Sequence, residues 1–364
     1  MNFYYLALQA AEGIGSRGAR KLLERFDNPK DLLRARSELL LKIPGLGPQR
    51  IKSLKSKEIF ERAEAELIRI SRDKVRMISI ADREYPERLK ECPDAPLVLF
   101  ARGDLELQGR RVISIVGTRK MTEYGEAFLH RLFAGMQRYD PVVVSGLAYG
   151  VDVCAHRLSL KYGLRTLGVL AHGMDRIYPR AHYRTALKMV QEGALLTEFW
   201  MGTAPERENF VRRNRIIAGI SEATIVVESS GSGGSLITAD LASSYHREVF
   251  AVPGRTLDAC SVGCNQLIKT NRAAMLTEAT DLEYMLNWEP VRESVASDEL
   301  LLTRLRQEGD KKVFELLQQK GRLHADQIAR ECDMHVSVLH PILLRLEMAG
   351  WIRGLSGKQY EPLI

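Results

Sequence analysis

The chain has 364 residues, enough for two or three domains, and its 45% hydrophobic and 27% charged residues are ordinary for a globular protein. No apolar run reaches the roughly 18 residues that a membrane span requires, and Met1 begins no secretory signal, so we expect a cytoplasmic protein without a membrane anchor. The five scattered cysteines predict reduced thiols and neither a metal site nor a cofactor, while the net charge of +7 favours polyanionic partners without selecting one class.

Residues 1–108 predict an N-terminal helical domain with a weak internal repeat. Gly13-Ile-Gly15 and Gly45-Leu-Gly47 lie 32 residues apart, and each precedes a helical pattern. The stretch from Ile43 to Arg50 resembles the hairpin of helix-hairpin-helix and SAM-like domains, where glycines let backbone N–H groups approach a phosphate. Such hairpins also serve only to join two helices, so the sequence leaves DNA contact by this domain open.

Residues 109–288 alternate short apolar runs with amphipathic stretches, which predicts an extended Rossmann-like α/β domain. Near-continuous apolar strands separated by helices are typical of a parallel sheet covered on both faces. Ligands of such sheets bind outside the carboxyl ends of the strands. The candidate binding loops are those that begin at Gly117, Gly146, His172, Trp200, Ser229 and Gly254.

Residues 289–305 form a polar linker, and residues 306–364 predict a winged helix. Helices are expected over 311–319, 325–332 and 336–348, followed by a β-hairpin over 351–360. The expected recognition helix, 337–347, holds one basic residue, and residues 291–364 carry 11 Lys and Arg against 11 Asp and Glu. Helices that enter the major groove normally present several basic or amide side chains. The composition therefore favours a protein contact over DNA reading for this domain.

Two loops of the α/β domain are candidates for phosphate binding. The first holds Gly117, which allows a close backbone approach, and Arg119, whose guanidinium suits a phosphate. The second runs from Ser145 and Gly146 through Tyr149 and Gly150 into a helix, with Asp152 at the expected N-cap. Tyr149 could stack on a base, although turn formation alone would also explain this loop.

The segment from Phe210 to Arg215 is the densest basic stretch of the α/β domain. An aromatic ring beside arginines suits single-stranded nucleic acid, because the ring stacks on bases and the arginines hold phosphates. On a helix, Arg212, Arg213 and Arg215 spread over about 300° of azimuth, so they cannot share one face. We therefore expect at least one of them to point inward.

Enzyme signatures are missing from the glycine-rich turns and around the histidines. The turn from Glu228 to Thr238 has neither a Walker lysine nor a dinucleotide-binding fingerprint, which leaves an anion-binding loop or a packing turn. His156, His172 and His182 lie near the strand-end loops, but none accompanies a nucleophile motif. We expect a non-catalytic protein.

Together these loops resemble the DNA-processing protein family DprA, also called Smf. The resemblance covers roughly 150 residues in one order and rests on the following stretches: Gly117-Thr-Arg119, Ser145 to Asp152, Ala155-His156, Tyr178-Pro179, Glu198, Phe210 with Arg213 to Gly219, Gly234 to Ala239, Ala251 to Gly254, and Gly263 to Ile268. Tyr85-Pro86, Pro96 to Phe100 and the C-terminal unit also look like this family.

The resemblance implies an extended Rossmann-like domain that binds single-stranded DNA, forms a homodimer and helps to load the recombinase RecA during natural transformation. It implies that Arg119 holds a phosphate, that the turn from Ser145 to Gly150 lines the site, and that Phe210 meets a base. Arg213 and Arg215 would supply positive charge, and Asn214 belongs to the same motif. The family often has lysine where this chain has Tyr149, which puts the charge at that position in doubt.

Two other functions compete with this hypothesis. Nucleotide phosphoribohydrolases of the LOG type share the Rossmann-like architecture and place a catalytic acid, a Glu, in a glycine-rich motif. The comparable turn here runs from Gly231 to Thr238, and no Glu follows it within four residues. A transcriptional regulator acting through the winged helix is the other alternative, and it is weakened by the nearly uncharged recognition helix.

Overall fold

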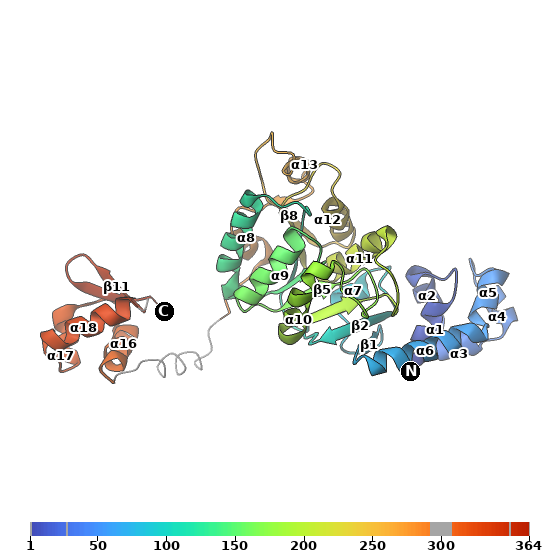
Figure 1. The fold of residues 1–364 in the computed structure, drawn as a ribbon, viewed down its shortest axis with the longest axis horizontal. Helices are drawn as coiled ribbons and strands as arrows, with labels where there is room; N and C mark the ends of the chain where they lie inside the picture. Colours follow the sequence, from blue (N-terminus) through green and yellow to red (C-terminus); the bar gives the residue numbers. More distant parts are fainter. Residues whose placement is uncertain (1, 27, 292–307, 349–350, 364) are drawn as a thin grey trace. The chain divides into compact units, whose positions relative to one another are not determined.

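The computed structural model describes residues 2–26, 28–291, 308–348 and 351–363. The chain divides into two compact units, Met1–Pro290 and Val291–Ile364, each of which is described by itself (Figure 1). Most of the expected linker, 289–305, lies outside the described residues.

The first unit begins with a group of packed helices. They are α1 (Asn2–Ala10), α2 (Ser16–Leu23), α3 (Pro29–Arg34), α4 (Ser37–Leu41), α5 (Pro48–Leu54) and α6 (Lys57–Arg72). Side chains cap two of these helices, since Asn28 accepts from the Asp31 N–H at 3.0 Å and Ser56 accepts from the Glu58 N–H at 3.2 Å. Fully buried leucines such as Leu6, Leu32 and Leu54 hold the group together.

A mostly parallel sheet forms the centre of the first unit. Its strands are β1 (Arg76–Ser79), β2 (Val98–Gly103), β3 (Val112–Val116), β4 (Val142–Ser145), β5 (Thr166–Val169), β6 (Ala194–Thr197), β7 (Ala223–Val226), β8 (Glu248–Ala251) and β9 (Ala274–Met275). They lie in the order β1-β2-β6-β5-β4-β3-β7-β8-β9. Strands β3 to β9 pair in parallel, which confirms the predicted Rossmann-like sheet.

Strands β1 and β2 differ from the sequence prediction. Both lie within residues 1–108, which were expected to be helical, and they extend the sheet through an antiparallel pairing of β2 with β6. The apolar run from Leu97 to Ala101 is fully covered, as an inner strand requires. The sheet therefore begins at residue 76, ahead of the expected α/β segment.

Helices cover both faces of the sheet. They are α7 (Glu87–Glu91), α8 (Glu123–Met136), α9 (Val151–Lys161), α10 (Tyr183–Glu192), α11 (Arg207–Ile220), α12 (Gly234–Ser244), α13 (Val262–Lys269) and α14 (Ala279–Leu286). Alternate residues of β3 point to opposite faces of the sheet. Ile113 and Ile115 pack in the core formed with α8 and α9. Val112 and Val116 pack in the core formed with α11 and α12. This double covering explains why the strands are apolar throughout.

The N-terminal helices share a continuous core with the sheet. Leu6 and Ile70 belong to the same cluster as Phe100 and Met189. The connection includes polar contacts, because the Met201 N–H donates to the buried Glu66 carboxylate at 2.6 Å and the Gln9 amide donates to the Glu198 carbonyl at 3.1 Å. The helices are thereby fixed to the loop that follows β6.

The second unit is a winged helix, as predicted. It contains α16 (Glu308–Lys320), β10 (Leu323–His324), α17 (Ala325–Glu331), α18 (Val336–Met348), β11 (Ile352–Leu355) and β12 (Gln359–Pro362). The strands form a small antiparallel sheet in the order β10-β12-β11, and residues such as Phe314, Ile328 and Leu343 form the core. Arg345, on the expected recognition helix, donates to Asp310 of α16 at 2.6 Å.

Within the part of the chain that the structure describes, no helix combines the length and apolar character needed to cross a bilayer. The same residues contain no group of three or more His, Cys, Asp or Glu side chains arranged to hold a metal ion.

Candidate nucleic-acid interface

A cavity of about 600 Å³ opens at the carboxyl ends of the parallel strands. We call it the strand-end pocket; it is bounded by the loop 117–119 after β3, the loop 229–235 after β7, and Phe210, Arg213 and Asn214 of α11. The chain runs from β3 through β4 and β5 on one side, and β7 returns to the other side of β3. Such a reversal of strand order is where open α/β sheets bind ligands.

Glycines allow the loops beneath this pocket to interlock. A Cβ atom at Gly117 would lie 2.5 Å from Val151 Cγ2. Gly150 has a left-handed φ of +73°, and a Cβ atom there would collide with the Thr118 carbonyl oxygen. The Val151 N–H donates to that carbonyl at 3.2 Å. Both glycines thus allow the close contact between these loops.

Arg213 lies beneath the strand-end pocket and is almost completely buried. Its guanidinium donates to the Gly146 carbonyl at 2.6 Å and to the Val169 carbonyl, so it ties α11 to the ends of β4 and β5. A side chain at Gly146 would collide with this guanidinium. Burial lowers the pKa of Arg213 to about 10, against the attraction of Asp152, so the group stays charged at neutral pH. Arg213 therefore places positive charge under the pocket, with its donors bonded to carbonyls.

Arg119 and Phe210 form the open rim of the same pocket. Arg119 is exposed, and its guanidinium carbon lies 5.3 Å from the centre of the half-buried Phe210 ring. The exposed Tyr178 ring lies 6.0 Å from the Phe210 ring at a tilt of 56°. Asn214 lines the pocket and accepts from Arg213 Nε at 3.3 Å. A cation and two aromatic faces are thus accessible side by side.

Tyr149 and Gly150 lie in an adjoining groove, which also has Arg119 in its lining. We call this cavity of about 620 Å³ the α8–α9 groove, because those two helices supply half of its lining residues. Tyr149 is 50% exposed and packs edge-on against His182 at 4.8 Å between ring centres. Tyr149 is therefore accessible beside the strand-end pocket.

Two polar residues of the loop after β4, Ser145 and Asp152, are buried and form hydrogen bonds within the protein. Ser145 is fully buried, and its hydroxyl donates to the Ile115 carbonyl at 2.6 Å, so it faces the sheet. Asp152 is the second residue of α9, and the expected N-cap position belongs to Gly150. The Ala148 N–H donates to the Asp152 carboxylate at 3.4 Å, and burial raises the pKa of Asp152.

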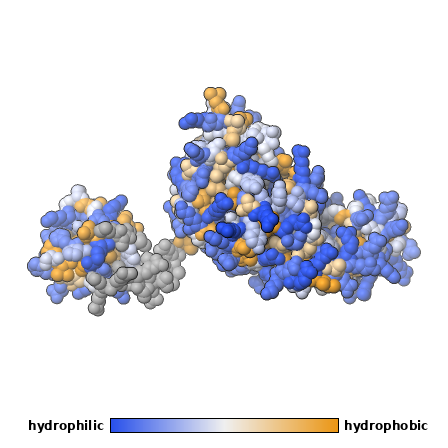
Figure 2. All heavy atoms as spheres, viewed as in Figure 1, coloured by the Kyte–Doolittle hydropathy of each residue, from blue (hydrophilic) through white to orange (hydrophobic). Residues whose placement is uncertain are grey.

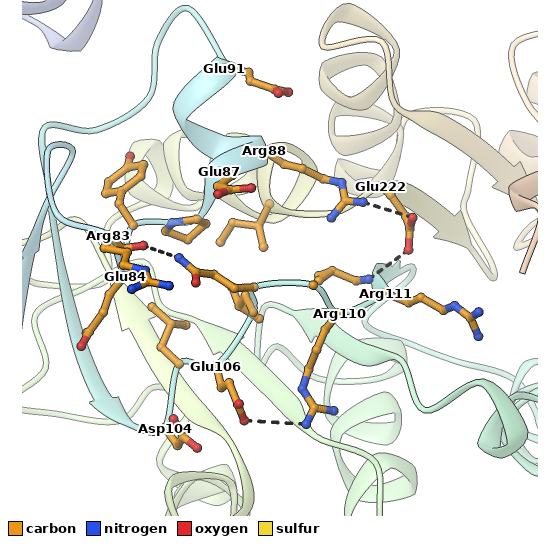
Figure 3. A pocket seen from close by; sticks show the side chains of 18 of the residues that line it. Arg83, Glu84, Glu87, Arg88, Glu91, Asp104, Glu106, Arg110, Arg111 and Glu222 are labelled. Atoms are coloured by element: carbon orange, nitrogen blue, oxygen red, sulfur yellow. Dashed lines mark hydrogen bonds and ion pairs between the residues drawn. The ribbon is translucent and has the colours of Figure 1, made fainter. Parts of the chain in front are cut away.

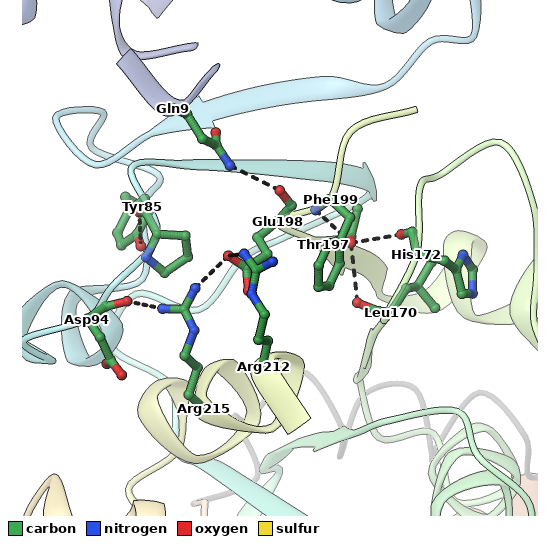
Figure 4. A network of polar contacts seen from close by, with 11 residues as sticks. Gln9, Tyr85, Asp94, Leu170, His172, Thr197, Glu198, Phe199, Arg212 and Arg215 are labelled. Carbon is green, nitrogen blue, oxygen red and sulfur yellow. Dashed lines mark hydrogen bonds and ion pairs between the residues drawn. The ribbon is translucent and has the colours of Figure 1, made fainter. Parts of the chain in front are cut away.

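Arg215 lies outside the strand-end pocket. Its guanidinium donates to the Asp94 carbonyl and to the carboxylate of Glu198, which is 2% exposed (Figure 4). Arg212 approaches the same carboxylate at 3.4 Å. A buried carboxylate requires compensating charge, and α11 supplies it here. The inward orientation predicted for at least one of the three arginines is confirmed, but Arg215 points to Glu198 instead of contributing to the pocket.

Two parts of the pocket were not among the predicted site residues. The loop 229–235 leads into α12, whose first turn, near Gly234 and Ser235, lines the pocket. The sequence left this turn as an anion-binding loop or a packing turn, because the adjacency of β3 and β7 follows only from the strand order. Arg207 is exposed and lines the pocket, but it stands between Glu206 and Glu208 and gave no signal in the sequence.

The histidines near the strand ends are engaged in structural contacts. His156 is fully buried with Nδ1 2.6 Å from Thr166 Oγ1, and burial lowers its pKa to about 3, so it is neutral at physiological pH. His172 Nε2 accepts from the Tyr178 N–H at 3.2 Å, and its Nδ1 lies 2.8 Å from the Gly173 carbonyl oxygen. His156 therefore joins α9 to β5, whereas His172 stabilises the loop that follows β5.

A larger cavity of about 1020 Å³ lies at the opposite edge of the sheet, near the start of β3 (Figure 3). Charges of both signs line it, and several of them pair with one another. Arg88 donates to Glu222 at 3.3 Å, the Val112 N–H donates to Glu222 at 3.0 Å, and Arg110 lies 3.7 Å from Glu106. We assign the candidate functional site to the smaller strand-end pocket, because that pocket lies at the carboxyl ends of the strands and the described residues include no acidic partner for Arg119 or Arg207 on its rim.

The fold and the pocket define a Rossmann-like domain that follows a helix-hairpin-helix domain and precedes a winged helix. The family model described as "DNA recombination-mediator protein A" matches residues 76–287, the DprA winged helix domain matches 304–358, and the SAM-like helix-hairpin-helix tandem matches 5–77. The chain therefore belongs to the DNA recombination-mediator protein A (DprA/Smf) family.

Curated relatives and solved structures agree with this assignment. The DNA processing protein DprA of Bacillus subtilis is 43% identical over 202 residues, covering 55% of this chain and 68% of that protein. A putative DprA of Mycobacterium tuberculosis is 34% identical over 318 residues, covering 82% of this chain and 80% of that protein. The structure of Streptococcus pneumoniae DprA superposes with a TM-score of 0.66 and 30% identity, covering 79% of this chain and 98% of that one. The structure of the Helicobacter pylori DprA is described as showing a single-stranded DNA binding mode. It superposes with a TM-score of 0.54 and 25% identity, covering 59% of this chain and 98% of that one.

Proposed function

We propose that this protein binds single-stranded DNA in the strand-end pocket without chemical turnover. The observation that carries the proposal is the rim of this pocket, where the Arg119 guanidinium lies 5.3 Å from the Phe210 ring centre, above the buried charge of Arg213. Among the described residues Arg119 has no acidic partner. Family membership supports the proposal, as does the description of the H. pylori relative as a single-stranded DNA binder.

The pocket offers separate partners for the two parts of a nucleotide. Arg119 and Arg207 are exposed cations suited to phosphates, and the first turn of α12, a helix N-terminus of the kind that binds anions, lines the same space. The Phe210 and Tyr178 rings offer faces for stacking to bases of any identity. Stacking on a side chain requires a base that is free of its own stack. The pocket should therefore prefer single strands to duplex.

We further propose that the protein acts in the cytoplasm as a homodimer that protects incoming single strands and helps to load RecA during natural transformation. Apolar side chains around α13 support self-association: Leu257 is 95% exposed, and Val262 and Met275 are about half exposed. Hydrophobic spheres lie at this end of the first unit in Figure 2. Exposed apolar side chains of this kind often mark protein contacts.

The winged helix suits a protein partner better than a DNA groove. Arg345 is bonded to Asp310, and Val336 and Val338 of α18 are exposed. This surface is a candidate for contact with a recombinase.

Fluorescence anisotropy with labelled oligonucleotides tests the proposed binding. We expect preferential binding of single strands over duplex of equal length, with affinity falling as salt rises because counterions are released. Arg119→Ala should weaken binding severalfold, since one charge-assisted contact is lost. Equal affinity for duplex and single strand would contradict the proposal and favour the transcriptional-regulator hypothesis.

Sedimentation velocity tests the proposed dimer separately. Leu257→Asp should convert a dimer to a monomer if the α13 surface mediates self-association, because a charge would then be buried in the interface. A wild-type monomer at micromolar concentration would contradict the dimer while leaving the DNA site untouched.

A further inference from the structure

The α8–α9 groove begins where the strand-end pocket ends. Arg119 lines both cavities, and Tyr149 and Gly150 stand at the junction in the groove lining. The groove is as large as the pocket, about 620 Å³ against about 600 Å³. A flexible chain held at Arg119 can therefore continue into the groove.

Four cations line the groove without acidic partners in the part of the chain that the structure describes. Lys120 adjoins Arg119, and Arg157 and Lys161 lie one turn apart on α9, so both point to the same side of the helix. All four are exposed, and none has a carboxylate within 4.0 Å among the residues that the structure describes. The acidic residue of the lining is Glu126.

Unpaired cations that converge on one concavity repel one another, and they attract an extended anion. The opposite-edge cavity shows the alternative arrangement, since Arg88 and Arg110 there pair with Glu222 and Glu106. The groove also presents Tyr149 at its mouth, and an accessible ring suits a base better than it suits an acidic side chain.

We propose that the α8–α9 groove is a second DNA subsite, which binds the phosphate backbone of the strand as it leaves the strand-end pocket. Arg157 and Lys161 are the proposed phosphate contacts, and Tyr149 stacks on a base between the two subsites. This inference rests on the proposed function of the strand-end pocket. It adds a direction for the strand, from Phe210 past Arg119 toward the C-terminal end of α9.

The inference predicts a dependence on oligonucleotide length. The test variant is Arg157→Gln/Lys161→Gln in the full chain, and binding is measured by anisotropy with oligothymidines of about 5 and about 15 nucleotides. The longer oligonucleotide should bind the variant about fourfold to ninefold more weakly, with each of the two lost phosphate contacts weakening binding about twofold to threefold. The shorter one should bind unchanged. The slope of log K against log salt for the longer one should become shallower by about 1.4, since about 0.7 is expected per phosphate on a single strand.

The chain offers a matched control on the neighbouring helix. Arg184 and Lys188 of α10 are also exposed and one turn apart, and neither lines the groove or the pocket. Arg184→Gln/Lys188→Gln removes the same net charge, so it should leave the affinity for the longer oligonucleotide within about twofold of wild type. An equal loss in the control would overturn the subsite, because net charge alone would then explain the effect.

The same measurements distinguish failure of the second subsite from failure of the proposed DNA-binding function. If wild-type protein binds neither oligonucleotide, the proposed function fails and the subsite fails with it. If wild-type protein binds both and the Arg157/Lys161 variant matches it in affinity and salt slope, the subsite alone is refuted. A variant that keeps both DNA affinities but loses binding to a labelled poly-glutamate peptide would instead assign the groove to an acidic protein segment.

Discussion

The two edges of the central sheet both carry arginines, but they use them differently. At the edge where the strands begin, Arg88 and Arg110 face Glu222 and Glu106 inside the larger cavity. At the edge where the strands end, Arg119 and Arg207 surround a smaller pocket without acidic partners among the described residues. Paired charges satisfy one another, whereas unpaired cations around a concavity leave an attractive potential for a polyanion. We therefore expect unpaired charge, rather than cavity size, to mark the edge of the sheet that binds DNA.

The largest expected effect tests whether the buried charge at the functional edge acts through folding. Arg213→Met should destabilise the protein by about 3–5 kcal/mol, because the carbonyls of Gly146 and Val169 lose a donor and Asp152 loses its counter-charge. Urea denaturation measures the change. Arg207→Met is the matched control on the same helix, and its stability should stay within about 0.5 kcal/mol of wild type. A stable Arg213→Met protein would show that the buried arginine is dispensable for the fold.

The next effect concerns the stacking face at the pocket rim. Phe210→Ala should lower the affinity for single-stranded DNA about tenfold to a hundredfold, since stacking on an aromatic side chain contributes about 1–3 kcal/mol per base. Phe210→Tyr keeps the ring and should bind nearly as wild type does. Anisotropy at one fixed salt concentration measures both. If Phe210→Ala and Phe210→Tyr bound single-stranded DNA with equal affinity, the ring would have no role in binding.

A smaller effect follows from the neutral histidine beneath the functional edge. The pKa of His156 is lowered to about 3, so between pH 6.5 and 3 the unfolded chain binds a proton at this position that the folded protein does not. Stability should therefore decrease as pH falls below 6.5, and one such group accounts for about 1 kcal/mol between pH 7 and 5.5. Chemical denaturation at those two pH values should show a smaller decrease for His156→Gln. An unchanged pH dependence in the variant would place the titration elsewhere.

The smallest effect on stability is expected at the edge where the strands begin and the arginines are paired with glutamates. Arg88→Gln removes a partner from Glu222, but the Arg88 side chain is 36% exposed, so the loss of stability should be below about 1 kcal/mol. Its affinity for single-stranded DNA should equal that of wild type. A clear loss of DNA binding in this variant would contradict the proposal that only the edge where the strands end binds DNA.

The sequence predicted those parts of the site that depend on local rules. Gly117 and Arg119 follow a buried strand, and the loops after parallel strands meet at one edge, so their placement followed from chain order. The role of Arg215 could not be predicted, because its partners Asp94 and Glu198 are brought to it by the tertiary fold. The loop at Ser229 was predicted as one of six candidate binding loops, but its position beside the loop at Gly117 could not be predicted, since the pairing of β7 with β3 joins residues about 110 apart in the sequence.

The extent of the sheet was the other part that local patterns left open. The short strand from Arg76 to Ser79 follows a long amphipathic helix, and its pairing partner β2 lies about twenty residues further on. An antiparallel pair of this kind has no helical crossover to signal it. The predicted boundary at residue 108 therefore divided strands that belong to one sheet.

The interlocked loops beneath the pocket have a consequence for kinetics. Gly117 and Gly150 let the two loops pack directly against one another. The cavity should therefore be formed already in the absence of DNA. A preorganised cavity spends little conformational entropy when it is filled, so association should proceed in one bimolecular step at a rate governed by long-range attraction between unlike charges.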